Sequence, residues 1–162
     1  MVAVPKPVCR VFYSKGDCNS MRKLSWSQLW TVQKCKSKAE SEAGKRYPIW
    51  SLEDGPGDAF RHAYWSALMA RELGSSLAKY VGDQHENLQG GNDPKKQAMD
   101  LHNNDLGRRI ASEHKNASDE VVANACAEAI RAGRARIIFN TKAEAEADAR
   151  RRAAQQAPDP TY

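Results

Sequence analysis

The stretch from Asp58 to Gly74 constrains the fold more than any other part of the sequence, because it predicts a helix that is apolar on nearly every face. Large apolar side chains such as Phe60, Trp65 and Met69 recur around it, with alanines between them. Gly74 then supplies a helix stop. A helix with so little polar surface is usually the central one, so the stretch predicts a bundle in which other helices surround it.

Capping residues predict where the surrounding helices begin. Ser25 and Gln28 form an S-x-x-Q capping box for a helix from Trp26 to about Ala43. Similar signals predict further helices over about 76–86, 94–114, 118–133 and 141–156. The predicted fold class is therefore all-α, a compact bundle of about five to six helices. The segment 136–139 is β-prone and could pair with 8–13 in a minimal two-stranded ribbon.

A chain of 162 residues is the length of one domain that buries about 70% of its unfolded surface. We expect an N-terminal extension over 1–24, a motif-bearing helical core over 25–114, C-terminal helices over 115–156 and a tail over 157–162. No apolar run approaches the roughly 20 residues that span a membrane, and the first residues lack the apolar core of an export signal. The alternative is a domain cut from a larger secreted protein.

The net charge of +5 and the pI of about 9.1 favour anionic partners. Basic residues cluster at 131–136 and at 150–152. Nucleic acid, phospholipid and peptidoglycan are all candidate substrates, and a solvated basic surface is the alternative. Charge alone therefore does not identify the reaction.

The four cysteines argue against a structural zinc site, because no pair has C-x-x-C spacing. Cys9 and Cys18 could close a short loop if the protein works in an oxidising compartment. The alternative is reduced, partly buried thiols at these positions and at Cys35. Cys126 lies on an alanine-rich helical stretch, which is typical of a small core residue.

Three short strings hold polar residues that helical spacing turns inward: GDAFRHAYW, GDQHE and MDLHNNDLGRR. In the first string Asp58 and His62 are four residues apart and share one helix face. A carboxylate one turn from an imidazole can orient the ring and raise its basicity. The alternative is that Asp58 only caps the helix and that His62 is a core histidine.

The second string contributes His85, which follows Ala78 and Val81 at helical spacing and therefore points toward the core. Glu86 lies beside it. The ring occupies a last helical turn, where the helix dipole favours its protonated form, although a metal ligand would have to be neutral. The fourth histidine, His114, is expected at the surface.

The third string places His102 and Asn103 on either side of an apolar stripe, with Asp100 and Asn104 further round the same helix. Adjacent asparagines oppose helix propensity, and a buried amide needs hydrogen-bond partners. Such local inconsistency is expected at functional sites. The alternative is that Asn103 caps a neighbouring helix.

Together these side chains predict one site at the centre of the bundle. The catalytic candidates are His62, His85, His102, Asp100 and Glu86. The substrate-binding candidates are Arg61, Asn103, Asn104 and Arg108.

Two mechanisms fit such a site. In the first, side chains hold a divalent ion, zinc or magnesium, which activates water against a phosphoester bond. The metal ligands would be His62, His85, His102 and Asp58. In the second, one histidine is a general base and another a general acid, while Asn103 and Arg108 bind an oxyanion. Neither spacing matches the HExxH, GxSxG or P-loop signatures.

The order GDAFRHAYWSALMARELG, GDQHE and AMDLHNNDLGRRIA resembles a family of domains at the C-terminal ends of bacterial polymorphic toxins, including Rhs-type and wall-associated secreted proteins. The resemblance covers roughly Asp54 to Ala111, about a third of the chain. It implies an effector that is secreted or delivered into a rival bacterial cell, with a cognate immunity protein as partner. It does not imply a particular reaction.

The resulting hypothesis is an antibacterial toxin domain that hydrolyses phosphoesters of nucleic acid or phospholipid with the help of a metal ion. A periplasmic peptidoglycan hydrolase is one alternative, and it would account for a Cys9–Cys18 bridge. The other alternative is a non-enzymatic binding domain, in which the histidines only satisfy one another's hydrogen bonds.

Overall fold

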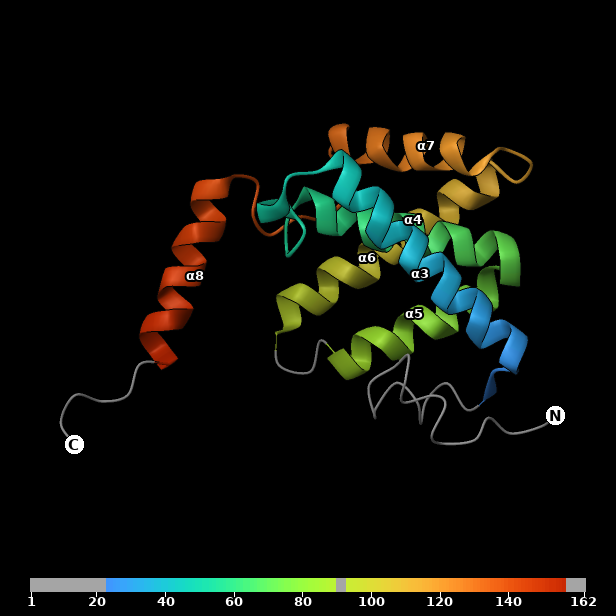
Figure 1. Ribbon diagram of the computed structural model, residues 1–162, viewed down its shortest axis with the longest axis horizontal. Coiled ribbons are helices and arrows are strands. Elements are labelled where there is room, and N and C mark those ends of the chain that lie inside the picture. The colour runs from blue at the N-terminus through green and yellow to red at the C-terminus, as the bar shows by residue number, and fades with distance from the viewer. Residues whose placement is uncertain (1–22, 90–92, 157–162) are drawn as a thin grey trace.

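The computed structural model describes residues 23–89 and 93–156. Within these ranges it contains α-helices and one short 3₁₀ turn, joined by brief loops (Figure 1). The elements are α3 (Trp26–Arg46), η2 (Ile49–Ser51), α4 (Pro56–Leu73), α5 (Ser75–Gln89), α6 (Pro94–Glu113), α7 (Asp119–Arg131) and α8 (Lys142–Gln156). The prediction of an all-α bundle is confirmed.

Helix α4 lies at the centre of the bundle, as its apolar sequence predicts. Helices α3, α5, α6 and α7 all pack against it, and α6 makes the most extensive contact (Figure 1). Every residue from His62 to Met69 is buried, so the helix has no solvent-facing side over two turns. Polar side chains on this helix therefore need partners inside the protein.

Helices α4 and α6 approach so closely that one position tolerates no side chain. A Cβ atom built on Gly107 of α6 would lie 1.9 Å from the carbonyl oxygen of Ala63 in α4. No real contact is that short, so glycine is required here. The backbones of the two helices consequently touch beside His62, which brings the inward side chains of α6 within reach of α4.

The predicted caps form as expected. The Ser25 hydroxyl accepts from the backbone N–H of Gln28 at 3.3 Å, and the Gln28 side chain accepts from the N–H of Ser25 at 2.8 Å. Asp93 caps α6 by accepting from the N–H of Lys95 at 2.9 Å. Similar side-chain caps open the last two helices, at Ser118 for α7 and at Thr141 for α8.

Two expectations differ from the structure. Helix α4 begins at Pro56 rather than Asp58, and its N-cap is Gly55, which has no side-chain cap of its own. The segment 136–139 is not a strand, because the N–H groups of Ile138 and Phe139 donate to the carbonyl oxygen of Asp54 at 2.9 and 3.0 Å. The segment 8–13, which was expected to pair with it, lies outside the described residues.

Helix α8 stands apart from the bundle and has its main contact with η2 (Figure 1). Most of its side chains are exposed. Among the described helices, none is long and apolar enough to cross a membrane.

Cys35 and Cys126 are buried free thiols. Burial raises the pKa of Cys35 to about 11 and that of Cys126 to about 12, so both thiols stay protonated at neutral pH. The expectation that Cys126 is a core residue is confirmed. Cys9 and Cys18 lie outside the described residues.

Candidate metal centre

His62, in the second turn of α4, lies among carboxylates from three helices. Its Nε2 is 3.3 Å from Asp58 Oδ1, one turn earlier on α4, and 3.5 Å from Asp100 Oδ1 on α6. Its Nδ1 is 3.3 Å from Glu86 Oε1 on α5. Asp58, His62 and Glu86 are only 4%, 6% and 2% exposed, so this is a buried charged cluster.

Asp58, His62 and Asp100 together offer a place for a metal ion. One ligand atom from each lies within 4.8 Å of the other two, and no other group of three or more such side chains occurs in the described ranges. Zinc ligands at about 2.0–2.1 Å in a tetrahedron are about 3.3–3.4 Å apart. The separations of 3.3 and 3.5 Å around His62 Nε2 match that spacing. A donor set of one nitrogen and two carboxylate oxygens suits zinc, magnesium or manganese.

The two oxygens of Asp58 have separate partners. Oδ2 accepts from the backbone N–H of Asp54 at 2.7 Å, on the chain just before α4. Oδ1 faces His62 and also accepts from Arg61 Nη2 at 2.5 Å. Asp58 is therefore not the N-cap of α4, which is Gly55. It holds the preceding chain with one oxygen and faces His62 with the other.

Glu86 lies on the other side of the ring, where it can hold His62 in position. Its Oε1 accepts from Nδ2 of Asn104 at 2.9 Å, which fixes the carboxylate between α5 and α6. His62 Nδ1 is buried and has no aligned hydrogen bond, although Glu86 is at ion-pair distance. Metal-ligating histidines commonly contact a carboxylate through the nitrogen that does not face the ion.

Burial of these charges shifts their pKa values strongly. Burial lowers the pKa of His62, but the carboxylates of Asp58 and Glu86 outweigh it and raise that pKa to about 10. Burial and the neighbouring carboxylates raise the pKa of Asp100 to about 7, against the attraction of His62. For Asp58 and Glu86 the contact with His62 overcomes burial, and their pKa values lie below the usual range.

Above a pH of about 7, where Asp100 is ionised, the cluster carries more negative than positive charge. Asp58, Glu86 and Asp100 face one imidazolium, and Arg61 is the further cation in contact with them. An unbalanced buried charge is costly. When Asp100 is ionised, a divalent cation between Asp58, His62 and Asp100 would offset the surplus negative charge.

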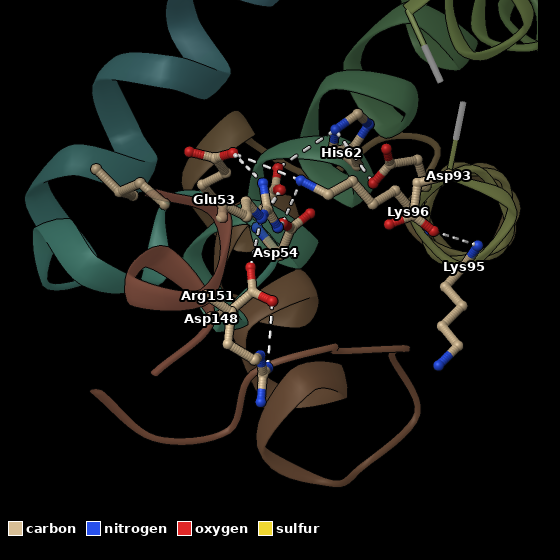
Figure 2. A network of polar contacts seen from close by, with 12 residues as sticks. Glu53, Asp54, His62, Asp93, Lys95, Lys96, Asp148 and Arg151 are labelled. Carbon is tan, nitrogen blue, oxygen red and sulfur yellow. Dashed lines mark hydrogen bonds and ion pairs between the residues drawn. The ribbon is translucent and has the colours of Figure 1, made fainter. Parts of the chain in front are cut away.

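A second polar network adjoins the cluster through Asp54. Lys96 of α6 pairs with the Asp54 carboxylate and lies 3.5 Å from Glu53 Oε1 (Figure 2). Arg152 of α8 reaches the same carboxylate, with Nη2 3.4 Å from Asp54 Oδ2. This network connects α6 and α8 to the loop that precedes α4.

A cavity of about 200 Å³ opens beside His62. Its lining residues come from α3, α4 and α5: Lys36, Glu40, Arg61, His62, Trp65 and His85. The ring of His85 meets Trp65 edge-on, with 5.1 Å between ring centroids. The charged residues of the lining are the two cations Lys36 and Arg61 and the carboxylate of Glu40.

The structure does not bring all three predicted histidines together. His102 lies elsewhere on α6, where its Nε2 is 2.8 Å from the carbonyl oxygen of Arg134. Asn103 clamps the same segment, donating to the carbonyl of Arg136 at 2.9 Å and accepting from its N–H at 3.0 Å. Neither contributes a ligand atom to the Asp58–His62–Asp100 group, and their side chains instead anchor 134–136.

His85 also lies outside the metal group, although it shares a cavity with His62. The expected ligand set of three histidines and Asp58 is thus replaced by one histidine and two aspartates. Arg61 and Asn104 do contact the cluster, through Asp58 and Glu86. Arg108 instead pairs with Asp105 at 3.1 Å.

Sequence reasoning did not single out Asp54, Lys36 or Glu40. Asp54 stands next to Gly55 in a turn-rich stretch, which favours an unusual backbone but does not identify a partner. Lys36 and Glu40 lie on a polar face of α3 that resembles any solvated helix surface. Only the packing of α3 against α4 shows that this face borders the cavity.

A family model described as a domain of unknown function (DUF6973) matches residues 21–134. This range includes α3 to α7 and every residue of the cluster. No curated protein and no solved structure matches the chain.

Proposed function

The chain belongs to the DUF6973 domain family, and we propose that this member is a metal-dependent hydrolase of phosphoesters in nucleic acid or phospholipid. The observation that carries the proposal is the largely buried Asp58–His62–Asp100 group, in which one ligand atom from each side chain lies within 4.8 Å of the other two. His62 also lines the adjoining cavity, through which a substrate would approach the group.

In the proposed mechanism Asp58, His62 and Asp100 hold a divalent ion, with Nε2 as the histidine donor. Such an ion supplies Lewis acidity and lowers the pKa of a water molecule. Glu86, at 3.3 Å from His62 Nδ1, would accept a hydrogen bond from Nδ1–H, which keeps the ring oriented and leaves the unprotonated Nε2 to coordinate the ion. Asn104 keeps Glu86 in place for that role.

The cavity residues supply the remaining functions. Lys36 and Arg61 would bind the anionic oxygens of the substrate. His85 would transfer a proton to the leaving group, because its imidazole lines the same cavity. The net charge of +5 would attract a polyanionic substrate over longer distances.

The proposal includes a role as an antibacterial effector, delivered into a target cell and neutralised by a cognate immunity protein. Its support is that the strings resembling the toxin family also supply the cluster. GDAFRHAYW contains Asp58 and His62, GDQHE contains Glu86, and MDLHNN contains Asp100. Expression in the bacterial cytoplasm or periplasm, followed by inspection of nucleic acid, phospholipid and sacculi, tests this part. Degraded sacculi alone would favour the peptidoglycan alternative.

Metal titration tests the centre directly. We expect calorimetry with Zn²⁺, Mn²⁺ and Mg²⁺ to show one site per chain for at least one ion, and His62→Gln to weaken it by more than about 100-fold. His114→Gln, at the C-terminal end of α6, is the matched control and should bind like the wild type. Hydrolysis of bis(p-nitrophenyl) phosphate should follow the same order. Absence of binding, or equal binding by both variants, would contradict the proposal.

A further inference from the structure

Asp54 has a backbone conformation that few residues adopt. Its φ is 60°, and it is the one non-glycine residue with positive φ in the part of the chain that the structure describes. It is also buried, at 4% exposure. Aspartate and asparagine tolerate this left-handed region better than other residues with a Cβ atom, and such conformations concentrate at functional sites.

Both backbone polar groups of Asp54 are engaged. Its N–H donates to Asp58 Oδ2 at 2.7 Å. Its carbonyl oxygen accepts from the N–H groups of Ile138 and Phe139, at 2.9 and 3.0 Å. Ile138 and Phe139 therefore hold the peptide group that follows Asp54, while Asp58 binds the peptide group that precedes it.

The side chain of Asp54 is held as firmly as its backbone. Its carboxylate pairs with Lys96, and Arg152 Nη2 is 3.4 Å away (Figure 2). Lys96 is four residues before Asp100 and shares its face of α6. Asp54 thus connects the helix that carries Asp58 to the helix that carries Asp100.

From these contacts we infer that Asp54 is a positioning residue for the proposed metal centre. Its left-handed backbone directs the N–H onto Asp58 Oδ2, and this bond leaves Oδ1 facing His62. A carboxylate without that bond could rotate and present its oxygens in other ways. The inference rests on the proposed function, because it assigns Asp54 to the alignment of a metal ligand.

The inference is tested by substitutions of Asp54 that differ in how well they tolerate the left-handed backbone conformation. Asp54→Asn and Asp54→Gly keep the N–H and accept positive φ, whereas Asp54→Ala and Asp54→Val strain it. All four lack the carboxylate, so they differ chiefly in backbone preference. By calorimetry with Mn²⁺ or Zn²⁺ we expect Asn and Gly variants to bind within about threefold of each other, and Ala and Val variants roughly tenfold more weakly.

Glu53→Ala is the matched control. Glu53 joins the same ion cluster through Lys96 but makes no contact with Asp58, so its removal should leave metal affinity unchanged. Equal affinity across the four Asp54 variants would overturn the inference, because the backbone would then have no influence. A wild type that binds no metal would instead refute the proposed function.

Hydrogen exchange decides the inference even without a metal ion. In the metal-free protein the N–H of Asp54 should exchange slowly with solvent, because it is hydrogen-bonded to Asp58. Asp58→Ala removes that hydrogen bond and should accelerate the exchange at least tenfold. Glu53→Ala leaves the bond in place and should not accelerate it. Rapid exchange in the wild type, or no change in Asp58→Ala, would show that the bond does not hold Asp58.

Discussion

Asp100 is the residue on which metal binding and stability conflict. Its pKa is raised from 3.8 to about 7, chiefly by burial and by neighbouring carboxylates. The folded state therefore binds the Asp100 proton more tightly than the unfolded state does. Its contribution to stability falls as the pH rises from about 4 to 7, and above pH 7 the folded chain carries the full penalty.

We therefore predict that Asp100→Asn stabilises the metal-free protein at pH 8 by about 1–3 kcal/mol and has little effect at pH 4. The same change should weaken metal binding strongly, because it replaces a charged ligand carboxylate by a neutral amide. Thermal unfolding followed by circular dichroism in the presence of a chelator measures the first effect. Asp105→Asn, at an exposed position of the same helix, should show no such pH dependence. Destabilisation by Asp100→Asn at pH 8 would contradict the charge argument.

Glu86 is predicted to act on the metal through His62. Glu86→Gln keeps the shape of the side chain but removes the charge beside Nδ1, so we expect metal affinity to fall by about 10–100-fold with the fold retained. Glu128→Gln, on the exposed face of α7, is the control. Calorimetric affinities within twofold of the wild type for Glu86→Gln would exclude this role.

At the residue scale the sequence predicted local pairs better than distant ones. Asp58 and His62 follow from the i, i+4 geometry of a helix, and the structure confirms that they meet. Asp100 was expected at the site, but its role as a ligand depends on how α6 is rotated against α4. His102 was expected to be a ligand because it leans inward. The segment 134–136 covers that side of α6, and nothing in the local pattern indicates this.

At the scale of elements, the contact between α4 and α6 depends on Gly107. Gly107→Ala places a methyl group against the Ala63 carbonyl, so we expect it to destabilise the protein by about 3 kcal/mol or more, as an overpacked core does. Gly44→Ala in α3 meets no atom within 4 Å and should stabilise it by about 0.5–1 kcal/mol. Urea denaturation of both variants measures the difference. Equal stability would show that the helices can separate freely.

Helix positions were predictable because caps and apolar periodicity are local. The capping boxes at Ser25 and Thr141 formed as expected, and α4 proved central. The prediction of a two-stranded ribbon was wrong for 136–139. The backbone of this segment bonds to residues distant in the sequence, and these contacts outweigh its β propensity. Asn103 and the Asp54 carbonyl take up the polar backbone groups that a strand would offer to its neighbour.

At the scale of the whole molecule, stability is unevenly distributed. Helix α8 is mostly exposed and has its main contact with η2, whereas α4 is surrounded by four helices. We predict that amides of α8 exchange with solvent at least 100-fold faster than those of 62–69, because few buried contacts protect them. Hydrogen exchange with mass spectrometry tests this, with α7 as an intermediate reference. Equal protection of α8 and α4 would contradict it.

The close passage of α4 and α6 at Gly107 also offers a criterion for comparing related chains. A chain that retained the LHNN string but carried a larger residue four positions after the first of its two asparagines, Asn103, would hold its two helices further apart. Its counterpart of Asp100 would then stand beyond the reach of the central imidazole. Relatives without glycine at this position would thus share the topology but lack the geometry of the proposed metal centre.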